Sequence, residues 1–288
     1  MRQAQLEIAA APSGGPLPAE PRTNLLFASV LLAFVAGVVI VWAAMSEPAR
    51  AIVGGTRAEP PIGQALVMVL VEGGGACSGV LVTPRAVLTA GHCLPKGRDI
   101  RVYAPSPDTP GPPRLIRPVA SAVHPGYVQN TRGSRRRSID LALLRLAEAL
   151  PAPFFPVSLA AISAPGAGDR VIVAGDGLSQ EGIASSSGTP RSISLPVVEP
   201  YGRGTILLWA APASDTGGGA CEGDSGGAIL EPQGALVAII AFAEGLGRAR
   251  CGKLTQGVLV APQRGFIDGT LAAWGESARW TDHADGLR

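Results

Sequence analysis

The chain has 288 residues, enough for one large domain or two small ones around a sizeable core. Its formal net charge of +2 is too small to indicate nucleic acid or an anionic partner, and only 16% of its residues are charged. It contains 38 glycines and 26 prolines, which favours many short strands joined by turns over long helices.

The first 51 residues divide into three segments. Residues 1–24 are polar and proline-rich, and we expect them to be disordered. Residues 25–45 are 21 uncharged, mostly apolar residues, longer than the 7–15 of a typical signal core and close to the roughly 20 of a spanning helix. They predict a hydrophobic signal or transmembrane helix. The protein is then either exported to the periplasm or medium, or anchored with its main domain outside the cytoplasm. Residues 46–51 are a processing junction.

From residue 52 to residue 288 the pattern is that of one globular region. Short runs rich in valine, isoleucine and leucine alternate with turn residues, which is typical of strands. The expected strands lie at 65–71, 78–82, 86–89, 139–146, 171–174, 206–209, 235–242 and 257–260. A helix is expected only near the end, at about 266–280. An all-β domain closed into barrels fits this order, because closure removes exposed edges.

Four cysteines are present, at positions 77, 93, 221 and 251. Their even number and the lack of C-x-x-C spacing favour two disulfides over a metal site, with three pairings open. Disulfides agree with the oxidising environment expected beyond a membrane.

Three stretches place reactive side chains at strand ends, where loops present functional groups. They are TAGHC with His92, IDLALL with Asp140, and CEGDSGGA with Ser225. A serine hydroxyl needs a base to take its proton, histidine is the usual base near neutral pH, and the histidine needs a carboxylate to orient it. Each residue also has a structural explanation by itself: a glycine turn, a structural histidine, or a cap at a strand entry.

Taken together, IVGG at 52–55, TAGHC, DLALL and GDSGG, in that order, resemble the chymotrypsin/trypsin family of serine peptidases. The resemblance extends from residue 52 to about residue 280. It implies an all-β fold of two six-stranded antiparallel β-barrels with a C-terminal helix and an active site between the barrels.

The resemblance also assigns roles. Ser225 would attack the scissile carbonyl and form an acyl-enzyme, His92 would act as general base and then general acid, and Asp140 would orient the imidazole. The backbone N–H groups of Gly223 and Ser225 would form the oxyanion hole. The implied disulfides are Cys77–Cys93 and Cys221–Cys251.

Substrate preference follows from the same comparison. The pocket floor, six residues before Ser225, is Gly219, where trypsin-like members carry an aspartate. A buried substrate cation would therefore lie unpaired. One pocket wall would be Ala241-Phe242-Ala243, with Gly257 opposite, which predicts small to medium apolar P1 residues. Glu222 and Glu244 could instead attract a basic side chain at the rim.

Activation would depend on the first residue of IVGG. In the family, the aspartate beside the nucleophile, here Asp224, pairs with the free α-amino group of that isoleucine, here Ile52. The preceding residues, Ala49-Arg50-Ala51, satisfy the A-x-A rule of signal peptidase. The hypothesis is that a single cut between Ala51 and Ile52 both exports and activates the protein.

Other expectations concern partners and departures from the family. Partners are protein or peptide substrates, a protein inhibitor, and the membrane if residues 25–45 are retained; a monomer is expected. No cofactor or metal is expected, since residues 105–118 offer calcium only Asp108. The Gly-Trp-Gly segment of the family reads Gly175-Asp176-Gly177 here, without the packing contact of the tryptophan.

The alternative function is that of a catalytically silent binding or membrane-anchored protein on the same scaffold. An esterase is disfavoured, because GDSGG is offset from G-x-S-x-G.

Overall fold

The computed structural model describes residues 52–104, 114–129, 137–161, 165–200, 202, 204–213, 217–245 and 247–282, all within one compact unit. The predicted segments at 1–24, 25–45 and 46–51, together with Asp108, lie outside the described residues. Among the residues that the structure describes, no helix has the length and apolar character needed to span a membrane.

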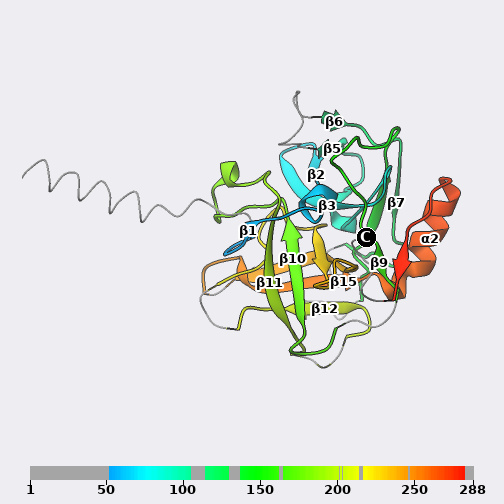
Figure 1. Ribbon diagram of the computed structural model, residues 1–288. Coiled ribbons are helices and arrows are strands. Elements are labelled where there is room, and N and C mark those ends of the chain that lie inside the picture. The colour runs from blue at the N-terminus through cyan, green and yellow to red at the C-terminus, as the bar shows by residue number, and fades with distance from the viewer. Residues whose placement is uncertain are drawn as a thin grey trace, which may run out of the picture. The chain divides into compact units, whose positions relative to one another are not determined.

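The second half of the chain forms a closed barrel (Figure 1, lower half). Six strands follow one another in the order β13–β10–β11–β12–β15–β14, and β14 pairs back with β13. Their bounds are β10 (Arg170–Gly175), β11 (Arg191–Val198), β12 (Leu207–Ala210), β13 (Ala228–Leu230), β14 (Leu236–Gly245) and β15 (Gly252–Leu259). The short strands β1 (Thr56–Arg57), β9 (Leu159–Ala160) and β16 (Trp280–Thr281) extend this sheet.

The first half forms a seven-stranded antiparallel sheet in the order β6–β5–β2–β3–β4–β8–β7. Its strands are β2 (Leu66–Val71), β3 (Gly75–Thr83), β4 (Ala86–Thr89), β5 (Ile100–Ala104), β6 (Arg114–Ile116), β7 (Ala120–Val123) and β8 (Ala142–Arg145). The predicted fold class is confirmed, with one difference in detail: this sheet is a half-barrel and not a six-stranded barrel, because β6 and β7 do not pair within the described residues. β6 has only three residues, and Pro118, between the two strands, has no N–H to donate to a ladder.

The all-β class and the C-terminal helix are confirmed, but several predicted elements have different bounds: β3 begins at Gly75 and β15 at Gly252, before the predicted residues 78 and 257. The strand expected at 139–146 begins only at Ala142, because the preceding residues form the loop that carries Asp140. The helix α2 runs from Arg264 to Ala273 and not to residue 280. Gly275, two residues later, has a φ of 71°, the left-handed conformation with which many helices end.

Buried side chains gather in three clusters, one inside each half and one between them. The strand β8 shows how the sequence supplies two of these clusters. Leu141 and Leu143 join the cluster between the halves, and Leu144 and Leu146 join the core of the first half. Successive strand residues point to opposite faces, so a continuous leucine run fills both cores.

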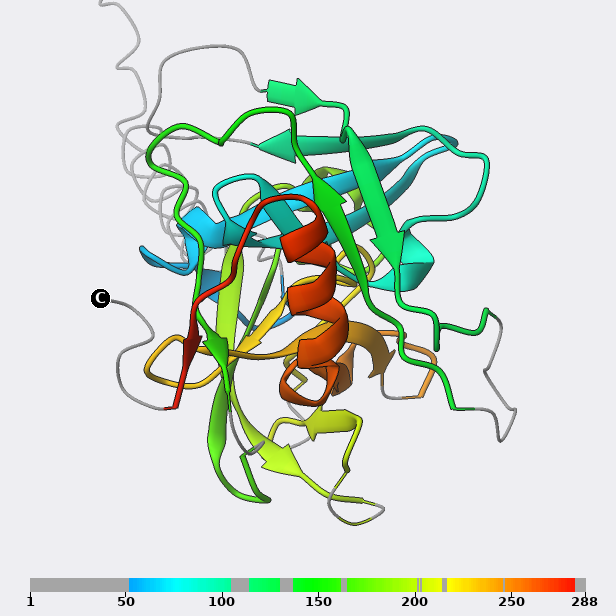
Figure 2. The same ribbon diagram turned by 90° about the vertical axis from the view of Figure 1, so that its right-hand side faces the viewer.

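The helix α2 covers the cluster between the two halves. Ile267 and Leu271 are fully buried there, and Figure 2 shows α2 lying across the outside of both sheets. Each residue of the chemistry-bearing stretches follows or precedes a strand at this same junction, so the packing of the halves positions the site.

Candidate active site

His92 is held by Asp140 through two contacts. His92 lies in the 3-10 turn η2 (Gly91–Cys93) that follows β4, and Asp140 lies just before β8. The Nδ1 of His92 is 2.6 Å from Oδ2 of Asp140, and the backbone N–H of His92 donates to Oδ1 at 2.8 Å. β4 and β8 are neighbours in the sheet, so the two loops leave it side by side. The carboxylate therefore fixes both the backbone and the ring of His92.

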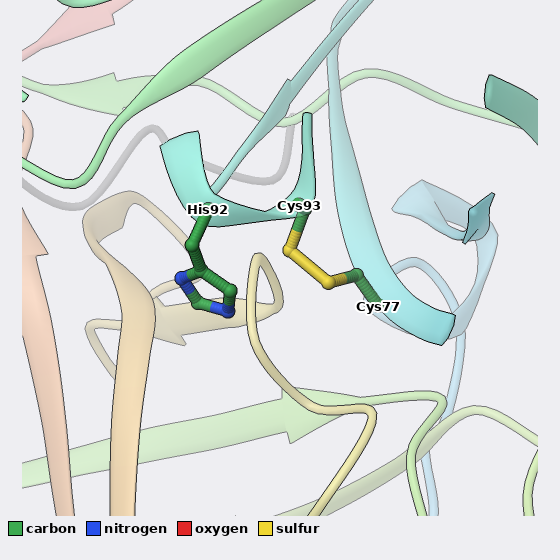
Figure 3. Close-up of side chains that lie close together, drawn as sticks. All are labelled: Cys77, His92 and Cys93. Atoms are coloured by element: carbon green, nitrogen blue, oxygen red, sulfur yellow. A yellow bond between two sulfur atoms is a disulfide. The ribbon is translucent and has the colours of Figure 1, made fainter. Parts of the chain in front are cut away.

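Ser225 lies against the same turn from the other half of the molecule. Its carbonyl oxygen accepts a hydrogen bond of 2.7 Å from the N–H of Ser78 in β3 and lies 3.8 Å from Sγ of Cys93. The structure thus brings the three predicted catalytic residues onto adjacent segments. Figure 3 shows the imidazole of His92 lying next to the Cys77–Cys93 disulfide, below the same turn.

Both implied disulfides are present, Cys77–Cys93 and Cys221–Cys251. The first attaches the His92 turn to β3, and the second joins the nucleophile loop to the start of β15. The sulfur atoms of the first bond lie close to His92, but cysteines in a disulfide have no thiolate to offer a metal. This cluster therefore orders the histidine turn and does not form a zinc-type site.

The backbone around Gly223 directs an N–H group away from the neighbouring chain at Leu178. The carbonyl of Glu222 accepts the N–H of Leu178 at 2.7 Å. Because a trans peptide is planar, the N–H of Gly223 in the same unit points the opposite way. Gly223 has a φ of 91°, and a Cβ there would come within 2.8 Å of the Cα of Gly177. Only glycine fits this position without displacing the neighbouring chain.

Asp224 is fully buried beneath the loop. Its Oδ1 accepts the N–H of Gly177 and its Oδ2 accepts the N–H of Cys221, each at 2.8 Å. Burial is the largest effect on this carboxyl and raises its pKa to about 7, against the opposing effect of the two backbone N–H groups.

Ile52 is likewise fully buried, within the core of the second half. The carbonyl of the next residue, Val53, accepts the N–H of Gly219 at 3.0 Å. The predicted activation residues, Ile52 and Asp224, thus both pack against the stretch of chain that runs from Gly219 to the nucleophile.

The predicted pocket residues lie together except for Gly257. Ala243, on the half-buried wall formed with Ala241 and Phe242, is paired across the β14–β15 ladder with Thr255. Gly257 lies opposite Ile240, and a Cβ at that position would point at core residues of the barrel. The residue paired with Ala243 across the ladder is therefore Thr255, and not Gly257.

A bulge explains the displacement. The register shifts between Ile240 and Phe242, so Ala241 has no partner and residues 242–244 of β14 are offset by one, until a second shift before Gly245 restores the register. Thr255 is fully buried, its Oγ1 accepts the N–H of Ala220 at 3.0 Å, and it lies 2.8 Å from where a Cβ on Gly219 would be. No sequence signal marked this threonine, because bulges leave none.

The two rim carboxylates already have basic partners. Glu222 lies 2.7 Å from Nη1 of Arg250, and Glu244 lies 3.5 Å from Nζ of Lys253. Both pairs are exposed and contribute little to stability. These basic partners do offset the negative charge of the two carboxylates, which weakens their attraction for a substrate cation at the rim.

Comparison with known proteins agrees with this fold. The Trypsin family model matches residues 52–260. Trypsin 5G1 of Aedes aegypti is 30% identical over 224 residues, 72% of this chain and 80% of its own. Human kallikrein-15 is 29% identical over 175 residues, 54% of this chain and 66% of its own. The structure of neuropsin, a serine protease of mouse brain, superposes with a TM-score of 0.61 at 24% identity, covering 76% of this chain and 99% of that chain. The chain belongs to the trypsin family of serine endopeptidases.

Proposed function

We propose that this chain hydrolyses peptide bonds with Ser225 as nucleophile, His92 as general base and acid, and Asp140 as the orienting carboxylate. The observation that supports it most directly is the double contact between His92 and Asp140, at 2.6 and 2.8 Å, on a turn that packs against the backbone of Ser225. A carboxylate on Nδ1 keeps the proton there, which leaves Nε2 free to accept the serine proton.

The chemistry follows from this arrangement. Oγ of Ser225 adds to the scissile carbonyl while Nε2 of His92 takes its proton. The oxyanion formed is stabilised by the N–H groups of Gly223 and Ser225, and each such donor contributes about 3–4 kcal/mol to the transition state. The imidazolium then protonates the leaving amine, which leaves an acyl-enzyme on Ser225. A water molecule, deprotonated by His92, releases the acid product and restores the serine.

A fluorophosphonate probe tests the nucleophile. The processed wild-type protein should be labelled, and Ser225→Ala should lose both labelling and detectable peptidase activity, since removing this serine in a triad costs about 10⁶-fold in kcat. Ser187→Ala, a surface serine whose Oγ donates to the carbonyl of Ala184, is the control and should be labelled normally. Absence of labelling in the processed wild type would favour the catalytically silent binding protein.

The pocket supports a preference for small P1 side chains. Gly219 supplies no carboxylate to pair with lysine or arginine, and the side chain of Thr255 occupies the space above it. Ala243 further narrows the entrance relative to glycine. The P1 residues best suited to this pocket are alanine and valine.

Thr255→Gly should enlarge the pocket. We expect kcat/KM for P1 leucine or phenylalanine, relative to P1 alanine, to rise about tenfold, because each added methylene that finds space contributes on the order of 1 kcal/mol. Gln256→Gly, the next residue of the same strand, controls for the cost of glycine in β15. A peptide library measures both variants. An unchanged preference in Thr255→Gly would show that another residue limits the pocket.

Export and activation complete the proposal. A cut between Ala51 and Ile52 would free the Ile52 amine to neutralise Asp224, which otherwise remains a buried acid. Relatives in this family act on proteins or peptides and are typically secreted, which agrees with export. N-terminal sequencing of the active protein should find Ile52 first, and another first residue would eliminate the single-cut route.

A further inference from the structure

Asp176 is a buried carboxylate that the proposed mechanism does not use. It is 0% exposed, and neither of its carboxylate oxygens has a hydrogen-bond partner among the described residues. Its backbone groups are satisfied: the N–H donates to Oγ of Ser78 at 2.9 Å, and the carbonyl accepts the N–H of Gly188 at 2.8 Å. A buried, ionised carboxylate without a partner is strongly unfavourable, so this side chain requires a cation or additional donors.

The backbone on both sides of Asp176 contacts the carboxylate of Asp224. The N–H of Gly177 donates to Oδ1 of Asp224 at 2.8 Å, and a Cβ on Gly175 would lie 2.4 Å from the same oxygen. The two acids therefore occupy one region beneath the nucleophile loop, and the charge of Asp176 acts on Asp224.

The two carboxylates receive few hydrogen bonds from the described residues. Each oxygen of Asp224 has one backbone N–H, and the two oxygens of Asp176 have none among the described residues. An α-ammonium group brings a positive charge and three N–H donors, more than Asp224 needs for itself. Ile52 is already buried in this half, with Val53 bonded to Gly219 five residues before Asp224.

We propose that Asp176 is a second carboxylate of the site that receives the Ile52 ammonium group, so that the new amino terminus is bound by Asp176 and Asp224 together. This inference rests on the proposed activation of the chain by cleavage before Ile52. At pH 7 and below, one ammonium, one ionised carboxylate and one protonated carboxyl group make a neutral buried cluster. As the pH rises above 7 the second acid ionises as well, so the ammonium then faces two carboxylates.

The ionisation of the two acids agrees with this assignment. Burial raises the pKa of Asp176 to about 7, and burial with the charge of Asp176 raises that of Asp224 to about 7. In the uncut chain, stability should fall as the pH rises from about 4 through 7, because the folded state holds protons that the unfolded state releases. Among the described residues, charged groups near this site include Arg191, opposite Gly175 in the β10–β11 ladder, and the surface ion pairs of Arg250 with Glu222 and Glu181.

The test compares Asp176→Asn with wild type in the full chain, with a specific protease site placed directly before Ile52 so that both are cut identically. Carboxylates raise the pKa of the ammonium above its ordinary value of about 8, and activity is lost as the pH rises through the raised pKa. With one carboxylate removed, that loss should begin about one pH unit lower. At pH 9, kcat/KM relative to the value at pH 7 should be roughly tenfold smaller in Asp176→Asn.

Asp176→Glu keeps a carboxylate, so its kcat/KM should decrease at alkaline pH over the same range as that of the wild type. A purely structural role of the side chain would not predict this recovery. If Asp176→Asn does not fold, Asp176→Ser provides the same comparison. If kcat/KM decreases over the same alkaline pH range in the wild type and in the neutral variants, the inference is overturned and the proposed function is left intact. Full activity in Asp224→Asn, or in the uncut chain, would instead overturn the activation step on which the inference rests.

Discussion

Asp140→Asn should lower kcat by about 10⁴-fold at neutral pH while the protein remains folded. Asp140 accepts two hydrogen bonds from His92, one from the backbone N–H and one at Nδ1 of the ring. An asparagine has only one acceptor oxygen. If that oxygen faces the backbone, its NH₂ group donates to Nδ1 and forces the ring proton onto Nε2, where the serine proton must go. If the oxygen faces the ring, the NH₂ group of the asparagine faces the backbone N–H of His92, and these two donors have no acceptor between them.

Steady-state kinetics on a P1-alanine peptide measures the loss, and thermal unfolding checks that the fold is retained. Asp169→Asn is the matched control, since Asp169 is an exposed acid that accepts one backbone N–H, from Gly166, far in sequence from the site. Its kcat should stay within twofold of wild type. A decrease of less than tenfold in Asp140→Asn would mean that another group orients His92.

Gly226→Ala should both unfold the protein more easily and disable the site. Gly226 has a φ of 85°, and a Cβ there would lie 2.1 Å from the carbonyl oxygen of Ser78 and 2.2 Å from Oγ1 of Thr89. These two atoms are joined by a buried hydrogen bond of 2.8 Å, so neither can move away easily. Overpacking and left-handed strain together cost about 3–5 kcal/mol. Because the displaced loop carries Ser225, kcat/KM should fall at least about 100-fold.

Chemical denaturation and peptide hydrolysis measure the two effects separately. The control is Gly269→Ala in the exposed middle of α2, where a Cβ would meet nothing within 4 Å. That change should stabilise the protein by about 1 kcal/mol, because alanine is the better helix former, and should leave kcat/KM unchanged. A Gly226→Ala protein with wild-type stability would show that the first half of the molecule can shift away from the nucleophile loop.

Local sequence patterns were sufficient for the elements that depend on local chemistry. The alternation of apolar and turn residues located eight of the sixteen strands in the described residues. The leucine run after Asp140 contributes to two cores, as expected for a strand buried on both faces. Errors arose where boundaries depend on tertiary contacts. Asp140 remains outside β8 because its carboxylate binds the turn of His92, and α2 ends early at the left-handed Gly275.

The sequence by itself determined the family, the order of the chemistry-bearing residues and the absence of an acid at Gly219, because these depend on residue identity within short motifs. Only the tertiary structure decided that Thr255 faces Ala243, since the unpaired Ala241 shifts the register of the next three residues of β14 by one. It alone also placed Asp176 with Asp224, which are 48 positions apart, under one loop. The sequence shows an aspartate in place of a tryptophan. The tertiary structure buries this aspartate away from water without a hydrogen-bond partner in the described residues, and that burial makes its ionised form unfavourable.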